Sequence, residues 1–597
     1  MADGVDAGGV MAPFREAKLL PVDLDVERRA DGAILIRSNI PLRAYEANIP
    51  AAFARRAEVS ADKAALAQRG ADGAWVYTTF AQLKRDMDAA TQWLLDQPEP
   101  GPVLILAGNT PAFAVMSFAA QASGRAVCPV STTYAALGGD YGRLAHVIAK
   151  AKPAVIFAQD STMAAGALDR LDLGGAVIVT TDPAKLSKPA TAYAEILATR
   201  ATARVAESIS RLQPGDRAAL MLTSGSTGLP KVVPITFDNL AANSAQCQQT
   251  IGEAAGWHDV MLDWLPWHHA AGAFVLRATL LEGGTLYIDD GKPAPGLFET
   301  SLRNLREISV SYFNNVPLGY AMLVDALEKD PVLRAAFFKK MRLMLYGGAG
   351  LSQSVYDRLQ AAAVAETGSR IMMTSGYGMT ETVSAFMVIH FETDKVGIGL
   401  PAPGTTVKLV PSGGRYEVRA KGPNVTLGYL DEPEKTTAAF DEEGFYRTGD
   451  LAIFHDPEDP TQGLAFAGRA AEEFKLSSGT WVYGGGLRDD LLKALSPLVL
   501  DLVLCDDGRP YLGVMLWPVA GADPAEIHRR LIAFNSHQHG GAARPKRALL
   551  LTEPPSANAH EISDKGTINR RAVIDGRGAD VERLFAETPD AGVMVLG

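Results

Sequence analysis

Hydrophobic residues recur along most of this chain as short runs, each followed by a polar turn and then by apolar positions at helical spacing. The run 103–106 leads through Gly-Asn-Thr-Pro into a helical stretch that ends near Ser123, and 126–130 is the next run. Similar runs lie at 154–157, 176–180, 218–222, 342–346 and 371–373. Strands that alternate with helices in this way predict α/β sheets.

The pattern changes after about Gly404. Segments there are short, alternate polar and apolar residues and are rich in turns, as in 406–410 and 416–419. They predict a small β-rich subdomain that completes a large N-terminal domain at residues 1–468. Residues 469–597 are predicted to form a small, mobile α+β C-terminal domain.

Charge and composition exclude several classes of protein. The 597 residues include 57 Lys and Arg against 68 Asp and Glu, a net charge of −11, which argues against a nucleic-acid partner. The longest apolar region, 103–126, is too often interrupted by Gly, Asn and Pro for a membrane span. Cys128, Cys247 and Cys505 have neither metal-ligand nor disulfide spacing. We therefore expect a cytoplasmic protein without a membrane partner.

The segment 223–231, Thr-Ser-Gly-Ser-Thr-Gly-Leu-Pro-Lys, is the most informative part of the sequence. It follows the run 218–222, and its hydroxyls, glycines and lysine are typical of a loop that turns backbone N–H groups toward phosphate oxygens. It is not a Walker A loop, because Pro230 precedes the lysine and Val232 follows it. For the segment by itself, a Ser/Gly-rich surface turn is the alternative.

Three later segments combine polar groups in a similar way. The segment 375–382, Ser-Gly-Tyr-Gly-Met-Thr-Glu-Thr, is not a dinucleotide fingerprint, because Glu381 stands at the third glycine position. Asp450 is placed where a carboxylate can accept from sugar hydroxyls, and Lys565 stands in a polar loop near the C-terminus. Each of the last two by itself also fits an ordinary turn or a solvated side chain.

Together and in this order, these segments resemble the acyl-adenylate-forming (AMP-binding) superfamily, which includes acyl-CoA synthetases, firefly luciferase and the adenylation domains of peptide synthetases. The resemblance covers about 51–572, and the segments 265–269, 474–482 and 562–566 look like those of bacterial feruloyl-CoA synthetases. It implies an acid–thiol ligase that uses ATP, Mg²⁺ and coenzyme A. Acyl-AMP and pyrophosphate would form first, and acyl-CoA and AMP second.

The resemblance also implies roles for single residues. Thr380 would contact the α-phosphate, Glu381 would bind Mg²⁺, and Lys565 would be the main catalytic cation for adenylation. Asp450 would accept from the ribose, with Arg469 nearby. The full set expected to bind ATP is Thr223, Ser224, Gly225, Ser226, Thr227, Gly228, Lys231, Gly348, Ala349, Gly350, Tyr377, Gly378, Met379, Asp450 and Arg469.

For the acid, the resemblance places His269 near the carboxylate, with His268 or a packed ring as the alternative. The expected acyl pocket is Trp267, His268, Phe274, Asn315, Tyr320 and Phe386, although core packing is the alternative for the aromatic residues. Rotation of the C-terminal domain would present the CoA-binding residues Lys475, Ser477, Ser478 and Gly479. Ala471 stands where many relatives have Asp or Lys, so the hinge residue is left open.

The identity of the acid is the least determined part of this interpretation. A hydroxycinnamate such as ferulate is the leading expectation. A ligase for another aromatic or medium-chain fatty acid, or an adenylating enzyme that loads a separate carrier protein, remains the alternative. A homodimer is also left open.

Overall fold

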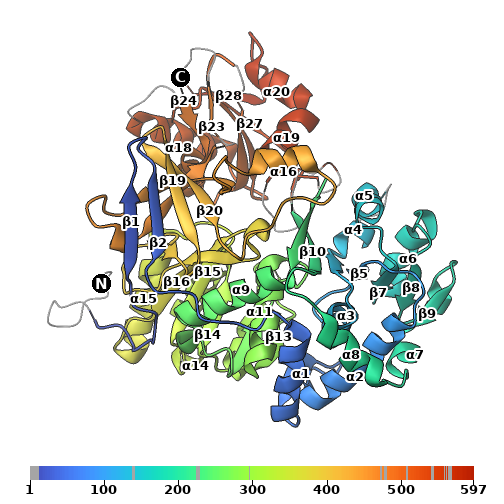
Figure 1. The fold of residues 1–597 in the computed structure, drawn as a ribbon. Helices are drawn as coiled ribbons and strands as arrows, with labels where there is room; N and C mark the ends of the chain where they lie inside the picture. The colour runs from blue at the N-terminus through green and yellow to red at the C-terminus, as the bar shows by residue number, and fades with distance from the viewer. Residues whose placement is uncertain are drawn as a thin grey trace.

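The computed structural model describes residues 12–136, 141–223, 229–294, 296–470, 473–475, 481–505, 509–538, 543–556, 559, 561–562 and 568–596. Figure 1 shows a large N-terminal part, in which helices flank several sheets, and a smaller C-terminal part beside the β-rich subdomain. This confirms the predicted α/β class with a large N-terminal and a small C-terminal domain. Within the described ranges, every helix is too short or too polar to cross a membrane.

A seven-stranded sheet is built from strands between residues 103 and 236. Val103 and Ile105 belong to one hydrophobic core cluster, and Leu104 and Leu106 belong to another, so the two faces of their strand pack separately. Because helices cover both faces, the strands read as unbroken apolar runs, which is the pattern that predicts them. In spatial order the strands are β11 (Lys231–Thr236), β10 (Arg217–Thr223), β6 (Val127–Val130), β5 (Val103–Leu106), β7 (Val155–Ala158), β8 (Val177–Thr180) and β9 (Ala190–Ala192). The helices of this region are α1 (Ile49–Val59), α2 (Phe80–Leu95), α3 (Pro111–Ala122), α4 (Thr133–Ala136), α5 (Gly142–Ala151), α6 (Ser161–Arg170), α7 (Tyr193–Leu197) and α8 (Ala203–Arg211).

Two further sheets make up the middle of the chain. One has the order β14 (Tyr312–Asn315), β15 (Leu343–Gly347), β16 (Met372–Gly378), β17 (Ala385–Val388) and β18 (Leu400–Pro401). The other has the order β12 (Val260–Asp263), β13 (Thr285–Ile288), β3 (Ala64–Arg69) and β4 (Trp75–Thr79). Because β14, β15 and β16 are parallel, their carboxyl ends lie at one edge. The helices here are α9 (Phe237–Cys247), α10 (Glu253–Ala255), α11 (Ala270–Glu282), α12 (Phe298–Glu307), α13 (Pro317–Lys329), α14 (Pro331–Phe338) and α15 (Gln353–Thr367).

The β-rich subdomain is a six-stranded antiparallel sheet. Its order is β1 (Leu24–Arg28), β2 (Ile34–Ser38), β19 (Thr406–Ser412), β20 (Arg415–Lys421), β21 (Tyr446–Phe454) and β22 (Leu464–Arg469), and α16 (Pro433–Ala439) lies between β20 and β21 in sequence. The β-rich character after Gly404 is confirmed. The hairpin β1–β2, blue in Figure 1, comes from the N-terminus and joins this sheet through the pair Val407 and Ile36, which the sequence pattern did not predict.

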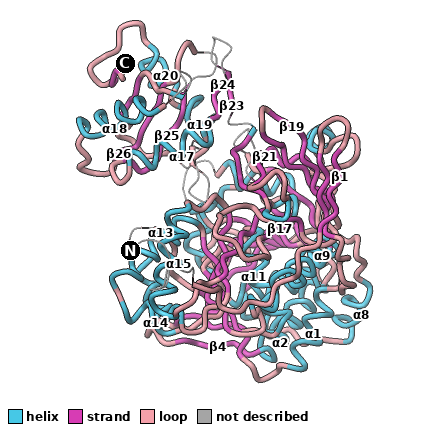
Figure 2. The backbone as a smooth tube through the Cα atoms, turned by 90° about the vertical axis from the view of Figure 1, so that its left-hand side faces the viewer, coloured by secondary structure: helices cyan, strands magenta, loops and turns pink. Residues whose placement is uncertain are grey.

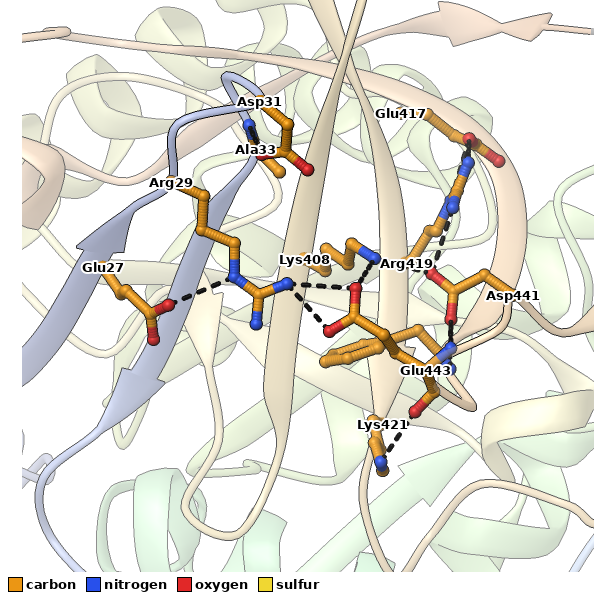
Figure 3. A network of polar contacts seen from close by, with 11 residues as sticks. Glu27, Arg29, Asp31, Ala33, Lys408, Glu417, Arg419, Lys421, Asp441 and Glu443 are labelled. Carbon is orange, nitrogen blue, oxygen red and sulfur yellow. Dashed lines mark hydrogen bonds and ion pairs between the residues drawn. The ribbon is translucent and has the colours of Figure 1, made fainter.

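A network of ion pairs ties that hairpin to the rest of the subdomain (Figure 3). Arg29 of the hairpin turn contacts Glu443 at 2.8 Å. Lys408 of β19 contacts Asp441 at 3.0 Å and also pairs with Glu443. Arg419 of β20 contacts Asp441 at 3.0 Å. The two acids lie directly before β21, so cations from three parts of the chain fix the start of that strand.

The C-terminal part has its own sheet and two hydrophobic core clusters built from residues that follow 486. In sequence order its elements are β23 (Glu473–Lys475), β24 (Trp481–Tyr483), α17 (Gly484–Leu495), β25 (Val499–Cys505), β26 (Gly513–Pro518), α18 (Pro524–His537), β27 (Arg547–Leu550), α19 (Arg570–Gly576), α20 (Gly578–Phe585) and β28 (Val593–Val595). Figure 2 shows α17, α18 and α20 gathered around β25 and β26 in one lobe. The three cysteines are free and buried.

Candidate active site

The predicted phosphate-binding segment connects two paired strands. β10 ends at Thr223, β11 begins at Lys231, and these two residues are partners in the antiparallel register. Lys231 Nζ lies 4.4 Å from the ring centroid of Tyr429, a cation–π contact. Ser224, Gly225, Ser226, Thr227 and Gly228 lie outside the described residues.

The predicted adenine-binding segments follow neighbouring strands. Gly347 of β15 and Gly376 of β16 are partners, so the residues after them, 348–350 and 377–379, lie at the same edge of a parallel pair. Ligands of α/β proteins bind at this edge. A Cβ atom at Gly350 would meet nothing within 4 Å, whereas one at Gly378 would lie 1.9 Å from the Ser384 carbonyl oxygen. The first segment therefore borders open space, and the second is packed against the backbone.

Three predicted ATP-binding residues form one hydrogen-bonded group. The Tyr377 phenol donates to Asp450 Oδ2 at 3.0 Å, and Arg469 Nε contacts Asp450 Oδ1 at 3.2 Å. Asp450 is 5% exposed. Burial raises the pKa of Asp450, and Arg469 and Tyr377 act in the opposite direction. The phenol and the guanidinium thus help to keep a buried carboxylate ionised.

Glu381 lies in the short 3-10 helix η3 (Thr380–Thr382) and is buried, with 5% of its surface exposed. Its Oε1 accepts a hydrogen bond of 2.8 Å from the Tyr429 phenol. The hydroxyls of Tyr429 and Tyr446 are 3.2 Å apart. The backbone N–H of Thr426 donates to the Glu381 carbonyl at 2.8 Å, which fixes the helix as well as the side chain.

Tyr429 and Tyr446 adjoin Glu381 in the candidate site, although the sequence analysis predicts no role for either. Tyr429 is separated from Glu381 by 48 residues and from Lys231 by a still longer segment. Neither tyrosine stands in a pattern that predicts chemistry. Only the segment 446–450, which ends with Asp450, placed Tyr446 near the site in sequence.

The histidines predicted near the acid lie just before α11. The rings of His268 and His269 are 4.3 Å apart, and His269 is the N-cap residue of the helix. Trp267 is 1% exposed and packs edge-on against Phe113, with ring centroids 5.6 Å apart. Phe274 packs in the same way on Trp257 at 5.3 Å. Both Trp267 and Phe274 belong to the same hydrophobic core cluster.

The other residues predicted for the acyl pocket lie elsewhere. Tyr320 belongs to a second core cluster, and its phenol donates to two backbone carbonyls at 2.8 and 2.9 Å. Phe386 belongs to a third cluster, where its ring lies 5.3 Å from that of Tyr377. Asn315 Oδ1 accepts from the Trp264 indole at 3.1 Å. The described contacts do not gather these residues into one group, and their role in acid binding stays a prediction.

The predicted C-terminal site residues are described only in part. Lys475 is in β23, and only its backbone is described. Ser477, Ser478, Gly479, Lys565 and the hinge candidate Ala471 lie outside the described residues.

The described groups fit a magnesium nucleotide. The open space at Gly350, the Tyr377 ring and the Asp450 carboxylate suit an adenosine, and the buried Glu381 offers a carboxylate oxygen. In the described ranges, no group of three or more His, Cys, Asp or Glu residues could hold a metal ion. A single carboxylate together with phosphate oxygens is a usual environment for Mg²⁺, so this is the arrangement that Glu381 would provide.

A family model described as "AMP-binding enzyme" matches residues 53–430, more than half of the chain. The chain belongs to this family. The superfamily predicted from the short segments is thereby confirmed. ATP, Mg²⁺ and coenzyme A, the predicted cofactors and co-substrates, are those of AMP-binding CoA ligases.

Among curated relatives, a long-chain-fatty-acid–CoA ligase from Escherichia coli O6:H1 is 27% identical over 363 residues, which are 59% of this chain and 61% of the relative. A 2-succinylbenzoate–CoA ligase from Staphylococcus epidermidis is 31% identical over 250 residues, 40% of this chain and 47% of the relative. The matched regions cover less than two thirds of either relative.

Among solved structures, the anthranilate CoA ligase AuaEII in complex with anthranoyl-AMP has a TM-score of 0.71 at 18% sequence identity. The match covers 91% of this chain and 99% of that one. At this level of identity the similarity establishes the shared fold, including the smaller C-terminal domain.

Proposed function

We propose that this AMP-binding enzyme is an AMP-forming acid–thiol ligase that converts ferulate or a related hydroxycinnamate to its CoA thioester. The observation that carries the proposal is the grouping of Tyr377, Asp450 and Arg469 beside the open turn at 348–350. This group offers an aromatic ring, an acceptor for ribose hydroxyls and a cation at the ligand-binding edge of a parallel sheet.

The reaction would proceed in two steps. In the first, a carboxylate oxygen of the acid attacks the α-phosphorus of ATP, the bond to the bridging oxygen breaks, and pyrophosphate leaves. In the second, the thiolate of coenzyme A attacks the acyl carbon, the acyl–oxygen bond breaks, and AMP leaves. Two anions meet in the first step, so positioning and charge stabilisation are what the protein must supply.

The candidate site residues each have a place in this scheme. Thr223 and Lys231 would bind the β- and γ-phosphates together with the loop between them, and Thr380 would contact the α-phosphate. Glu381 would hold Mg²⁺, which neutralises phosphate charge when bound. Lys565 would bridge the substrate carboxylate and the α-phosphate. In the second step, Lys475 and the residues after it would contact coenzyme A.

The choice of a hydroxycinnamate rests on sequence. The segments 265–269, 474–482 and 562–566 resemble bacterial feruloyl-CoA synthetases. An aromatic acid also agrees with the fold shared with an anthranilate CoA ligase. Fatty acids are the alternative, because a long-chain-fatty-acid–CoA ligase is among the relatives.

We further propose a domain boundary between Gly468 and Arg469 and a rotation of the C-terminal domain between the two steps. Arg469 is the last residue of β22, and it contacts Asp450 of the N-terminal domain, so a pivot there would couple domain rotation to the nucleotide site. A cytoplasmic location is proposed because both ATP and coenzyme A are supplied there.

The test is product analysis by mass spectrometry. The protein is incubated with Mg·ATP, coenzyme A and ferulate, coumarate, caffeate, cinnamate, benzoate or octanoate. Feruloyl-CoA with AMP is the expected product. ADP in place of AMP would overturn the adenylating mechanism, a CoA ester of octanoate alone would overturn the substrate class, and acyl-AMP without a thioester would indicate a carrier protein as the acceptor.

A variant separates the two steps. Lys565→Ala should abolish acyl-AMP formation and largely spare thioester formation from supplied acyl-AMP. Equal loss in both steps would contradict the role given to this lysine.

A further inference from the structure

Tyr429 contacts two of the charged residues that the proposed function assigns to Mg·ATP, Glu381 and Lys231. Its phenol donates to Glu381 Oε1 at 2.8 Å, and its ring lies 4.4 Å from Lys231 Nζ. In the described part of the chain, Lys231 and Glu381 form no ion pair with each other. One aromatic side chain is therefore the shared contact of the cation and the anion.

The backbone around Tyr429 is fixed on both sides. The Tyr429 N–H donates to Thr436 Oγ1 at 3.0 Å, and the N–H of Leu430 donates to the carbonyl of Val232 in β11 at 2.9 Å. The second contact ties this segment to the strand that carries Lys231. Tyr429 is 8% exposed, so packing limits the movement of its side chain as well.

A neutral donor has an electrostatic advantage at this position. Glu381 is buried, and a buried carboxylate without a hydrogen-bond partner is energetically costly. An arginine or lysine in that position would neutralise the carboxylate and compete with a metal cation. A phenol satisfies one oxygen and leaves the negative charge in place.

Tyr446 adds a second hydroxyl to the contact between Tyr429 and Glu381. The hydroxyl pair at 3.2 Å lets Tyr446 donate to Tyr429 while Tyr429 donates to the carboxylate.

We propose that Tyr429 is a positioning residue for ATP: its hydroxyl orients Glu381 for Mg²⁺, and its ring holds Lys231 for the phosphates. This rests on the proposed function, since both charged residues receive their roles there. The hydroxyl and the ring act on different parts of Mg·ATP, so they can be separated by substitution.

Tyr429→Phe keeps the ring and removes the donor, whereas Tyr429→Leu removes both. Tyr416→Phe is the matched control, because it removes a phenol from β20 in the same subdomain, far in sequence from the predicted site residues. The first readout is calorimetric binding of ATP at a series of Mg²⁺ concentrations without any acid. The second is ATP–pyrophosphate exchange with the acid that the wild type activates. Circular dichroism and the melting temperature check folding.

We expect Tyr429→Phe to raise the Mg²⁺ concentration for half-maximal ATP binding about 10-fold, since a hydrogen bond to a charged group is lost. Tyr429→Leu should in addition weaken ATP binding at saturating Mg²⁺ by about 5-fold, through loss of the cation–π contact. A folded Tyr429→Phe protein with the Mg²⁺ dependence of the wild type would overturn the inference and leave the proposed function intact. A wild type that does not bind Mg·ATP would overturn both, whichever acid is tested.

Discussion

Asp441 at the centre of the subdomain network offers a quantitative test of how this fold is stabilised (Figure 3). Its side chain is 5% exposed, and its Oδ2 accepts from Lys408 and Arg419 at 3.0 Å each. Burial by itself raises the pKa of Asp441, but the Phe445 N–H and the two cations outweigh it and lower the pKa to about 2. The ionised carboxylate is thus strongly preferred in the folded protein.

The size of the effect follows from that pKa. An unperturbed aspartate has a pKa of about 3.9, and lowering it to about 2 corresponds to about 2.5 kcal/mol. Asp441→Asn removes the charge and leaves Lys408 and Arg419 beside an amide. We therefore expect the free energy of local unfolding to fall by at least about 2.5 kcal/mol, and by about 3–5 kcal/mol if it behaves like other broken buried pairs.

Hydrogen exchange followed by mass spectrometry is the suitable assay, because it reports on this subdomain separately from the other parts of a large chain. Peptides from 406–421 and 446–454 should exchange about 70-fold faster in Asp441→Asn at pH 7. The matched control is Asp456→Asn in an exposed turn of the same sheet, which should change stability by less than about 0.5 kcal/mol.

The pH dependence supplies the refutation. Because the pKa of Asp441 is lowered by folding, its contribution is complete above about pH 5 and is lost as the pH falls toward 2. The difference between wild type and Asp441→Asn should therefore be constant from pH 7 to pH 5 and shrink below pH 4. Equal exchange at pH 7, or a difference that grows on acidification, would refute the reasoning.

Three further predictions concern single side chains. Tyr377→Phe removes the 3.0 Å hydrogen bond to Asp450 and keeps the ring, so the KM for ATP in pyrophosphate exchange should rise about 10-fold with an unchanged melting temperature; an unchanged KM would be the contrary result. Gly378→Ala would place a Cβ 1.9 Å from the Ser384 carbonyl oxygen, so it should lower the melting temperature and abolish adenylation. Gly350→Ala would place a Cβ with nothing within 4 Å, so it should keep the wild-type melting temperature. Equal melting temperatures of the two variants would be inconsistent with this packing. Arg277 is 6% exposed, and burial lowers its pKa to about 10. Its Nε donates to the Ser244 hydroxyl, and its guanidinium lies 5.6 Å from the Phe274 ring centroid. Because burying the charge is costly, Arg277→Met should leave the free energy of urea unfolding unchanged or higher; a loss above about 2 kcal/mol would show that these two contacts outweigh the cost of burial.

Much of the fold could be predicted because its strands are buried on both faces. The apolar runs 103–106 and 154–157 were predicted as strands, and the structure confirms both as β5 (Val103–Leu106) and β7 (Val155–Ala158). The pairing of β2 with β19 could not be predicted in this way, because it joins residues more than 360 positions apart and both strands are locally ordinary. Local patterns determine which residues form strands, whereas the order of strands depends on long-range packing.

The positions of the candidate site residues were predictable to the extent that these residues follow strands, whereas their role in nucleotide binding stays a prediction. Thr223 and Tyr377 stand at or near the ends of β10 and β16, as their segments indicated. The role of Tyr429 was not predictable. Its hydrogen bond to Glu381 joins residues 48 positions apart, and the hydrogen bond from Leu430 to Val232 of β11 that holds its segment is not indicated by any sequence pattern. In sequence, a loop tyrosine looks the same whether its phenol faces solvent or a carboxylate.

The aromatic residues predicted for the acyl pocket also show that residue type alone does not determine where a side chain packs. Both Phe386 and Phe274 were predicted to line the acyl pocket because they are aromatic. In the structure, Phe386 packs on Tyr377, whereas Phe274 packs on Trp257 in a different core cluster. If the Phe386 ring stays against Tyr377 when ATP binds, it would influence the nucleotide more than the acid. Phe386→Leu should then change the KM for ATP, and Phe274→Leu the KM for the acid, so a pair of kinetic measurements would assign each ring to its substrate. If instead Phe386→Leu changed the KM for the acid and Phe274→Leu changed the KM for ATP, the acid would bind beside β17 and not near Trp257.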